Sequence, residues 1–438
     1  MIRKDVLKEI IRDFHMRELP EVIERDVKVS AGSGKVISIV GVRRSGKTYL
    51  MFHTIRKLLE SGEPVERMIY VNFEDERLEF KREELDLIIQ AYRELYPDQN
   101  LKDCFFFFDE VQNVEGWERF VRRVYDSISK NVFITGSNSR LLSTEIATSL
   151  RGRTVKVETF PLSFGEFLRF KGFEFFPSKD VYSSSRRAKL VNLFEEYVTF
   201  GGFPEVVLSE ERDFKLRILQ EYFDVMLYRD LVERYNISNP YVLKFFIKRV
   251  FESTGKPLSV NRIFNQLKSG GYRIGKDTLY QYLDYATAVY LVRVLQKYSK
   301  SVLKRELGEK KVYAVDNGLL MALSFEMGRD YGRLLENAVF NELLRQGGEL
   351  FFYKNRKECD FVWFVEGQPV LIQVSYELRD KRTSEREIAG FMDVCRFFGK
   401  KEGYILTAGT EEEHIEDGIH INVLPAWKFL LTLPATFS

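Results

Sequence analysis

The sequence predicts an α/β protein whose N-terminal part contains a parallel β-sheet. Four short apolar runs, at residues 36–40, 68–73, 105–108 and 131–136, lack the alternation of a half-buried strand. Such runs are typical of parallel strands that are buried on both faces. A helical pattern follows the first run, as expected when a crossover helix connects parallel strands. With 438 residues, the chain has room for about two to four domains.

The first apolar run leads into a glycine-rich loop with the pattern G-x-x-x-x-G-K-T. The loop consists of Gly41, Val42, Arg43, Arg44, Ser45, Gly46, Lys47 and Thr48, and Tyr49 begins the helical pattern. The glycines let backbone N–H groups turn inward to hold phosphate oxygens, and the helix N-terminus adds a positive end. In such a loop the lysine reaches the β- and γ-phosphates and the threonine ligates Mg²⁺. We therefore predict that residues 41–49 bind ATP with Mg²⁺; contact of the two loop arginines with phosphate stays open.

The third apolar run consists of four phenylalanines and ends in two carboxylates, Asp109 and Glu110. At the carboxyl end of a parallel strand these side chains emerge where ligands bind in open α/β sheets. We assign Asp109 to the Mg²⁺ shell. Glu110 is assigned to activating the attacking water, a role worth roughly 10²–10⁴ in rate. Together with Lys47, this pair predicts hydrolysis as well as binding.

Composition narrows the class of protein. Apolar residues make up 45% and charged residues 30%, which is typical of a globular chain. No apolar run reaches the roughly 18–20 residues of a membrane helix, so no membrane partner is expected and the cytoplasm is the predicted location. Cys104, Cys359 and Cys395 form no C-x-x-C pair, and the histidines show no metal-ligand spacing. A catalytic zinc ion is not expected.

The net charge of +2 conceals a basic segment. Residues 243–311 carry 15 Lys and Arg against 5 Asp and Glu, a local charge of +10. A concentrated positive charge points to a polyanionic partner. We predict that DNA binds through this segment.

The N-terminal helical pattern at residues 3–19 is expected to pack on the nucleotide-binding core. Arg17 and Arg25 follow its apolar positions and could approach a nucleotide. Surface arginines are more often solvated or ion-paired, and that interpretation is favoured for both.

The paired phosphate loop and carboxylates, with the polar end of the fourth apolar run, resemble the AAA+ ATPases. In that family a polar residue at this strand end senses the γ-phosphate, and Asn138 or Ser137 matches it here. An asparagine at the end of the second strand can restrain the catalytic glutamate, which makes Asn72 the candidate. Arg151 or Arg153 could act as an arginine finger on the chain's own or a neighbour's nucleotide, with a structural ion pair as the alternative.

Two later phrases make the resemblance more specific. Pro-Leu-Ser-Phe-x-Glu-Phe begins at Pro161, and Gly-Gly-Phe-Pro-Glu begins at Gly201. With the motifs above they resemble archaeal ATPases that join an AAA+ core to a winged helix and a degenerate restriction-endonuclease-like tail. The resemblance implies four domains: a nucleotide-binding core at residues 1–170, a helical lid at 171–242, a winged helix at 243–315, and an endonuclease-like domain at 316–438.

The basic segment has the element order of a winged helix-turn-helix. Its expected recognition helix carries Lys276, Thr278, Tyr280 and Gln281, and its expected wing carries Lys297, Lys300, Lys304 and Arg305. Cations on a wing contact phosphates without reading sequence. The alternative is a winged helix that docks a protein partner.

The tail has the helix–strand order of an endonuclease-like core with an altered catalytic set. Active members of that fold place a glutamate on the first helix, an aspartate on the second strand and Glu-x-Lys on the third. Glu336 and Asp360 match the first two, but the third strand reads Gln373-Val374-Ser375. A neutral glutamine anchors Mg²⁺ poorly, so we predict that nuclease activity is lost. Glu358 is the obvious substitute ligand.

The sequence therefore predicts a Mg²⁺-dependent ATPase coupled to DNA binding. One alternative is an ATP-dependent nucleic-acid-processing protein with cryptic nuclease activity. The other is a slow-hydrolysing switch that recruits a protein partner. The sequence leaves the biological process and the oligomeric state open.

Overall fold

The computed structural model of the chain describes residues 4–78, 80–137, 150, 152–177, 183–323, 330–377 and 381–436. The chain has two compact units. The N-terminal unit comprises residues 1–160 with 288–290, and the C-terminal unit comprises residues 161–287 and 291–438. The predicted boundaries at residues 170, 242 and 315 all lie within the C-terminal unit and stay predictions. Asn138 and Arg151 lie outside the described residues.

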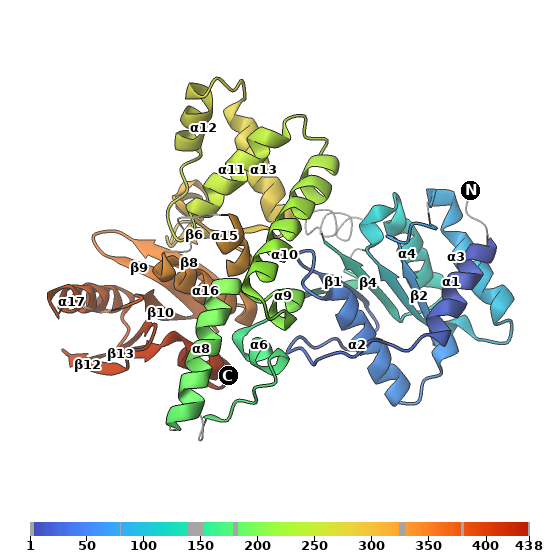
Figure 1. Ribbon diagram of the computed structural model, residues 1–438, viewed down its shortest axis with the longest axis horizontal. Helices are drawn as coiled ribbons and strands as arrows, with labels where there is room; N and C mark the ends of the chain where they lie inside the picture. The colour runs from blue at the N-terminus through green and yellow to red at the C-terminus, as the bar shows by residue number, and fades with distance from the viewer. Residues whose placement is uncertain are drawn as a thin grey trace. The chain divides into compact units, whose positions relative to one another are not determined.

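The N-terminal unit is built on a five-stranded sheet of order β2-β3-β4-β1-β5, in which every pairing is parallel. Figure 1 shows α4 and α2 on opposite sides of these strands. This arrangement confirms the predicted α/β class. The elements are α1 (Lys4–Met16), β1 (Val36–Val40), α2 (Lys47–Glu60), β2 (Met68–Asn72), α3 (Asp86–Leu95), β3 (Phe105–Asp109), α4 (Trp117–Ser127), β4 (Val132–Gly136) and β5 (Thr154–Glu158).

The phenylalanine run of β3 explains how this sheet is buried on both faces. Phe105 and Phe107 pack into a cluster with apolar residues of α2. Phe108 points to the other face, where its ring centroid lies 5.4 Å from that of Phe120 in α4. Phe133 of the neighbouring β4 stacks on Phe107 at 4.7 Å. One uninterrupted apolar strand therefore packs against two helix layers, as the sequence pattern predicts.

The C-terminal unit begins with helices and ends in a second sheet. Its elements before the tail are α6 (Phe164–Phe170), α8 (Ser184–Phe200), α9 (Pro204–Leu208), α10 (Arg212–Val225), the π-helix η6 (Met226–Glu233), α11 (Pro240–Glu252), α12 (Val260–Ser269), α13 (Lys276–Ala288), β6 (Val292–Lys297), α14 (Val302–Leu307), β7 (Lys310–Ala314) and α15 (Asn317–Leu323). The tail contains α16 (Tyr331–Gln346), β8 (Glu349–Lys354), β9 (Glu358–Val365), β10 (Gln368–Val374), α17 (Lys381–Phe398), β11 (Glu402–Thr407), β12 (Glu412–Glu416), β13 (Ile419–Pro425) and α18 (Ala426–Thr436).

The second sheet has eight strands in the order β12-β13-β11-β10-β9-β8-β6-β7 and is mixed. The hairpin expected for the winged helix is present as β6 and β7, which pair antiparallel. It joins the tail sheet, because Gln296 and Lys297 of β6 pair with Phe351 and Phe352 of β8. Helix α14 lies where the sequence predicts a basic wing. The difference arises because a local element order does not identify the distant strand that pairs with the edge of a hairpin.

The two phrases that carry the family resemblance contact each other in the C-terminal unit. The N–H of Leu162 donates to the carbonyl of Gly202 at 2.7 Å. The buried Asp316 side chain accepts the N–H groups of Gly202 and Gly318, at 2.7 and 2.8 Å, and burial raises its pKa to about 7. Gly201 has φ 74°, and a Cβ there would lie 1.9 Å from Asp316 Oδ1. Only glycine fits this position. The Gly-Gly pair therefore allows the end of α8 to pack closely against Asp316, the residue before α15.

Within the described part of the chain, no helix has both the length and the hydropathy needed to cross a lipid bilayer.

Candidate active site

The phosphate loop connects β1 to α2 and depends on its two glycines. Gly41 has φ 151°, and a Cβ at that position would lie 2.1 Å from the carbonyl oxygen of Thr159. Gly46 has φ 93° and precedes α2, which begins without a side-chain cap. An anion can therefore accept hydrogen bonds from the first amides of α2, at the positive end of the helix. The backbone has the form that phosphate binding requires.

Arg25 supports the loop from the N-terminal segment. Its guanidinium donates to the carbonyl of Ser45 at 3.0 Å and to the carbonyl of Phe160 at 2.8 Å. Arg25 thereby connects the phosphate loop to the segment that follows β5. The sequence favoured a solvated or ion-paired role for Arg25, and the structure shows a contact of its guanidinium with the backbone of the loop.

Lys47 is buried at the centre of the candidate site. Its Nζ atom donates to Ser137 Oγ at 2.8 Å and lies 3.4 Å from Glu110 Oε1. It also contacts the carbonyls of Gly41 and Val42, at 3.4 and 3.3 Å. The phosphate-loop lysine and the predicted catalytic carboxylate are thus direct neighbours, although one lies after β1 and the other after β3.

Asp109 lies beside the threonine of the phosphate loop. Thr48 Oγ1 donates to Asp109 Oδ2 at 2.8 Å, and the Tyr70 hydroxyl donates to the same oxygen at 2.9 Å. The hydroxyl of Thr135 donates to the other oxygen, Oδ1. Burial and the neighbouring charge of Glu110 raise the pKa of Asp109. A hydroxyl and a carboxylate oxygen at this separation are the hard ligands that Mg²⁺ prefers, so these residues fit the predicted ion.

Glu110 is held by three side chains. Its carboxylate accepts from Gln112 Nε2 and from Ser137 Oγ, the latter at 3.1–3.2 Å, and pairs with Lys47. Its backbone is left-handed, with φ 53°, and its N–H donates to Thr135 Oγ1 at 2.8 Å. A left-handed non-glycine residue is uncommon and is often found at functional sites.

Neighbouring positive charges keep the Glu110 carboxylate ionised although it is buried. Burial by itself favours the neutral acid, but the ammonium of Lys47, the amide of Gln112 and the cation of Arg43 outweigh it. Their combined effect lowers the pKa of Glu110. The carboxylate therefore remains ionised at neutral pH, and Lys47 is the largest favourable contribution.

Asn72 does not restrain Glu110, contrary to the sequence-based expectation. Its Oδ1 accepts the N–H of Glu74 at 2.9 Å, which stabilises the turn after β2. An asparagine at a strand end serves such turns equally well. Gln112, two residues after the glutamate, makes the side-chain contact that was expected of Asn72.

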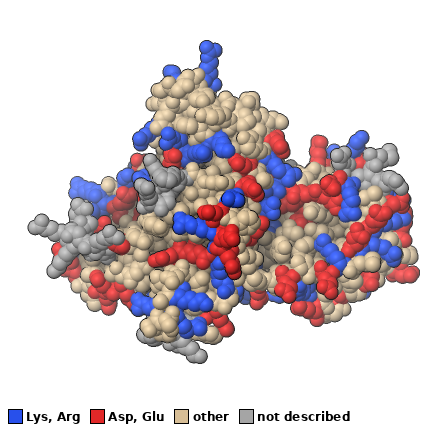
Figure 2. Space-filling view, in the orientation of Figure 1, with Lys and Arg blue, Asp and Glu red and all other residues tan. Residues whose placement is uncertain are grey.

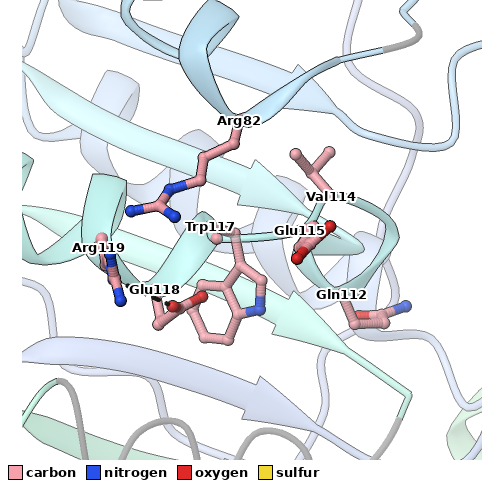
Figure 3. A pocket seen from close by; sticks show the side chains of 8 residues that line it. Arg82, Gln112, Val114, Glu115, Trp117, Glu118 and Arg119 are labelled. Atoms are coloured by element: carbon pink, nitrogen blue, oxygen red, sulfur yellow. Dashed lines mark ion pairs between the residues drawn. The ribbon is translucent and has the colours of Figure 1, made fainter.

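Gln112 also lines a surface cavity of about 320 Å³. Figure 3 shows Gln112 at one end of this cavity and Arg82 and Arg119 at the other, with Trp117 between them. Gln112 Oε1 is buried and has no hydrogen-bond partner. The amide that holds Glu110 is therefore part of the wall between the candidate active site and this cavity.

The other residues that the sequence proposed for the site lie in different surroundings. Arg43 pairs with Glu74 at 3.0 Å, and Tyr49 is exposed. Arg153 pairs with Asp126 at 3.0 Å, the alternative that the sequence offered for it. It precedes β5, whose first residue pairs with the first residue of β1. A strand of this length spans roughly 16 Å. Arg153 therefore lies at the amino end of the parallel strands, whereas the phosphate loop lies at their carboxyl end. At that distance Arg153 cannot serve as an arginine finger for its own chain's nucleotide.

Sequence reasoning missed Tyr70, Thr135 and Gln112. Thr135 is a polar residue in an otherwise apolar strand, and this interruption was the signal that could have identified it. Tyr70 and Gln112 are unremarkable in the sequence. Their proximity to the carboxylates depends on strand order and on the turn after Glu110.

The N-terminal unit contains a P-loop domain of the AAA type. Residues 33–168 match the family described as an AAA domain. Residues 191–330 and 331–429 match two domains of unknown function, DUF8612 and DUF4143.

The chain belongs to the family of uncharacterized protein MJ1544 of Methanocaldococcus jannaschii. The two are 38% identical over 99% of this chain and 97% of the relative. An uncharacterized protein of Haemophilus influenzae is 33% identical over 90% of this chain and 93% of its own. Among solved structures, the Walker-type ATPase PABY2304 of Pyrococcus abyssi is similar with a TM-score of 0.41 and 15% identity, over 74% of this chain and 96% of that one. The relatives include a bacterial as well as an archaeal protein.

The shape of the phosphate loop leads to a test at Gly41. We expect Gly41→Ala to weaken ATP binding at least about tenfold, because the new Cβ would overlap Thr159 and displace the loop amides. Gly409→Ala is the matched control, since no atom lies within 4 Å of a Cβ there. Fluorescent-nucleotide titration of both folded variants measures the effect. Equal affinity in Gly41→Ala and the parent would show that the loop does not hold phosphate.

Proposed function

We propose that this chain binds ATP with Mg²⁺ and hydrolyses it. The observation that carries the proposal is the convergence of three groups at one edge of the parallel sheet. Lys47 pairs with the buried Glu110, and Thr48 donates a hydrogen bond to Asp109, the residue before Glu110. Each is of the residue type that phosphoryl transfer needs at that place. Membership of the AAA domain family supports nucleotide binding.

Lys47 connects binding to catalysis. In the structure its ammonium pairs with Glu110, while phosphates carry more negative charge than one carboxylate. A bound triphosphate therefore competes for Lys47 and draws it away from Glu110. Loss of this positive neighbour raises the proton affinity of Glu110. The glutamate becomes a better general base only when the substrate is in place.

The other residues of the site would hold the metal ion and orient the catalytic carboxylate. Thr48 and Asp109 would hold Mg²⁺, which would supply positive charge to neutralise the phosphates. Glu110, oriented by Ser137 and Gln112, accepts a proton from the attacking water. An arginine finger from Arg153 requires a neighbouring copy of the chain, because that residue lies at the opposite edge of its own sheet.

Two substitutions separate binding from turnover. We expect Lys47→Ala to abolish measurable ATP binding, whereas Glu110→Gln binds ATP and hydrolyses it roughly 10²–10⁴ times more slowly than the parent. Lys57→Ala and Glu60→Gln, at exposed positions of α2, are the controls and should behave as the parent. Equilibrium binding and phosphate release measure the two effects. Normal turnover by Glu110→Gln would show that another group activates water.

We further propose that the basic segment binds DNA. Helix α13 buries Leu279 and Tyr282 and exposes Lys276, Tyr280 and Gln281. An amphipathic helix with this polar face fits a groove-binding role. Figure 2 shows Lys and Arg side chains bordering the region of α11–α13. The positive charge of the segment favours DNA over the alternative, a docked protein partner.

Salt dependence tests the proposed DNA contact. We expect neutralisation of Lys300, Lys304 and Arg305 to weaken binding of any duplex and to reduce the slope of log affinity against log salt by about three, because each of these cations would neutralise one phosphate. Lys57, Lys81 and Arg93, exposed cations of the N-terminal unit, form the control triple variant. Fluorescence anisotropy across a salt series measures both. An unchanged slope in the first variant would remove these contacts from the proposal.

The tail is proposed to have lost nuclease activity. Gln373 Oε1, the oxygen that would have to bind a metal ion, accepts the N–H of Asp360 at 3.1 Å. Ser375 Oγ donates to Glu387 Oε2 at 3.3 Å. Both altered positions of the third strand thus have structural contacts. Within the described residues, no group of three or more His, Cys, Asp and Glu side chains is arranged to hold a metal ion.

A further inference from the structure

The tail contains an ion cluster around a buried lysine, and this cluster joins strands from both sides of the predicted boundary at residue 315. Lys311 of β7 lies among Glu336 of α16 and Glu358 and Asp360 of β9. The first helix and second strand contribute their acidic residues as the endonuclease-like interpretation requires. The cation comes from a strand that the sequence assigned to the winged helix.

The Lys311 ammonium lies at the centre of these carboxylates. Its Nζ atom is 2.9 Å from Asp360 Oδ1, 3.4 Å from Glu336 Oε1 and 3.6 Å from Glu358 Oε1. Its side chain is only 2% exposed, against 9% for Asp360. Nζ also lies 5.6 Å from the ring centroid of Phe352. A charge this deeply buried is stable only when it is paired.

Two of the carboxylates also accept hydrogen bonds from groups other than Lys311. Tyr313 donates its hydroxyl to Glu336 Oε1 at 2.7 Å, and the N–H of Val374 donates to Asp360 Oδ2 at 3.1 Å. These donors orient both carboxylates toward Lys311. The arrangement is a hydrogen-bonded ion cluster rather than an open set of metal ligands.

The ionisation of the cluster agrees with a single internal cation. Burial lowers the proton affinity of Lys311, but the facing carboxylates outweigh it and raise the pKa of its ammonium well above the usual range. Burial and the Asp360 charge raise the pKa of Glu336 to about 8. The Lys311 ammonium supplies the positive charge that the facing carboxylates would otherwise require from a metal ion.

We propose that the Lys311 ammonium takes the place of a divalent cation in the tail, so that Glu336, Glu358 and Asp360 form a permanent, metal-independent ion cluster. It joins β7, α16 and β9 within the C-terminal unit. The resemblance to endonuclease-like folds implies a metal ion here, and these residues do not fit one while Lys311 is present. This inference does not depend on ATP hydrolysis or DNA binding.

The test compares Mn²⁺ binding in four full-length proteins by electron paramagnetic resonance of the free ion. They are the parent, Lys311→Ala, Asp360→Asn and the double variant. The difference that Asp360→Asn makes reports binding at the tail alone, because any Mn²⁺ at the phosphate loop is common to all four. Lys310→Ala is the matched control, since alternate residues of a strand point to opposite faces.

We expect the parent and Lys310→Ala to bind no Mn²⁺ that Asp360→Asn removes. Lys311→Ala should gain one Mn²⁺ per chain, at least tenfold tighter than any Asp360-dependent binding in the parent, and should lose it in the double variant. Its melting temperature should fall below that of Lys310→Ala and recover with Mn²⁺. A structural lysine without a cation role would lower the melting temperature without this recovery.

Two results would overturn the proposal. One is Asp360-dependent Mn²⁺ binding, or Asp360-dependent DNA cleavage, by the parent. The other is a folded Lys311→Ala protein that gains no Mn²⁺. If Lys311→Ala is insoluble even with Mn²⁺, the parent measurement decides: absence of Asp360-dependent binding supports the cluster, and its presence contradicts it.

Discussion

The parallel pairing of β3, β4 and β1 is the constraint on which the candidate active site depends. Parallel strands end at the same edge, so residues that follow β1, β3 and β4 meet there although they are far apart in the chain. β4 lies between the other two. Its Thr135 contacts Asp109 of β3 and the next residue, Glu110, and Ser137 contacts both Glu110 and Lys47. The central strand thereby links the acidic residues to the phosphate loop.

The motifs could be predicted because their chemistry is local. Gly41 and Gly46 have the backbone angles that a phosphate loop needs, and the phenylalanines of β3 are buried on both faces as a continuous apolar run requires. β5 was not predicted, because Thr154-Val155-Lys156-Val157-Glu158 is polar and half exposed at the sheet edge. Edge strands carry a weaker apolar signal than central ones. Residues that act through distant contacts, such as Tyr70, gave no such signal.

The C-terminal unit shows the same limit at a larger scale. The element order predicted a winged helix, whose hairpin is β6 and β7, but not the pairing of this hairpin with β8. In the sequence, Lys311 looked like one more cation of a basic segment. In the structure it is buried, and its nearest acidic partner, Asp360, lies 49 residues later in the chain. Part of the charge that suggested a DNA-binding surface therefore belongs to the core. The cations of α14, by contrast, remain near the surface and support the proposal of DNA contact.

The central claim is that an ATPase domain works with a DNA-binding segment in one chain. Steady-state ATP hydrolysis in Mg²⁺, measured with and without duplex DNA on a sample of known oligomeric state, tests it most directly. We expect turnover that requires Mg²⁺ and a rate that changes when DNA is added. Absence of turnover under both conditions would contradict the ATPase assignment, and a rate indifferent to saturating DNA would contradict the coupling.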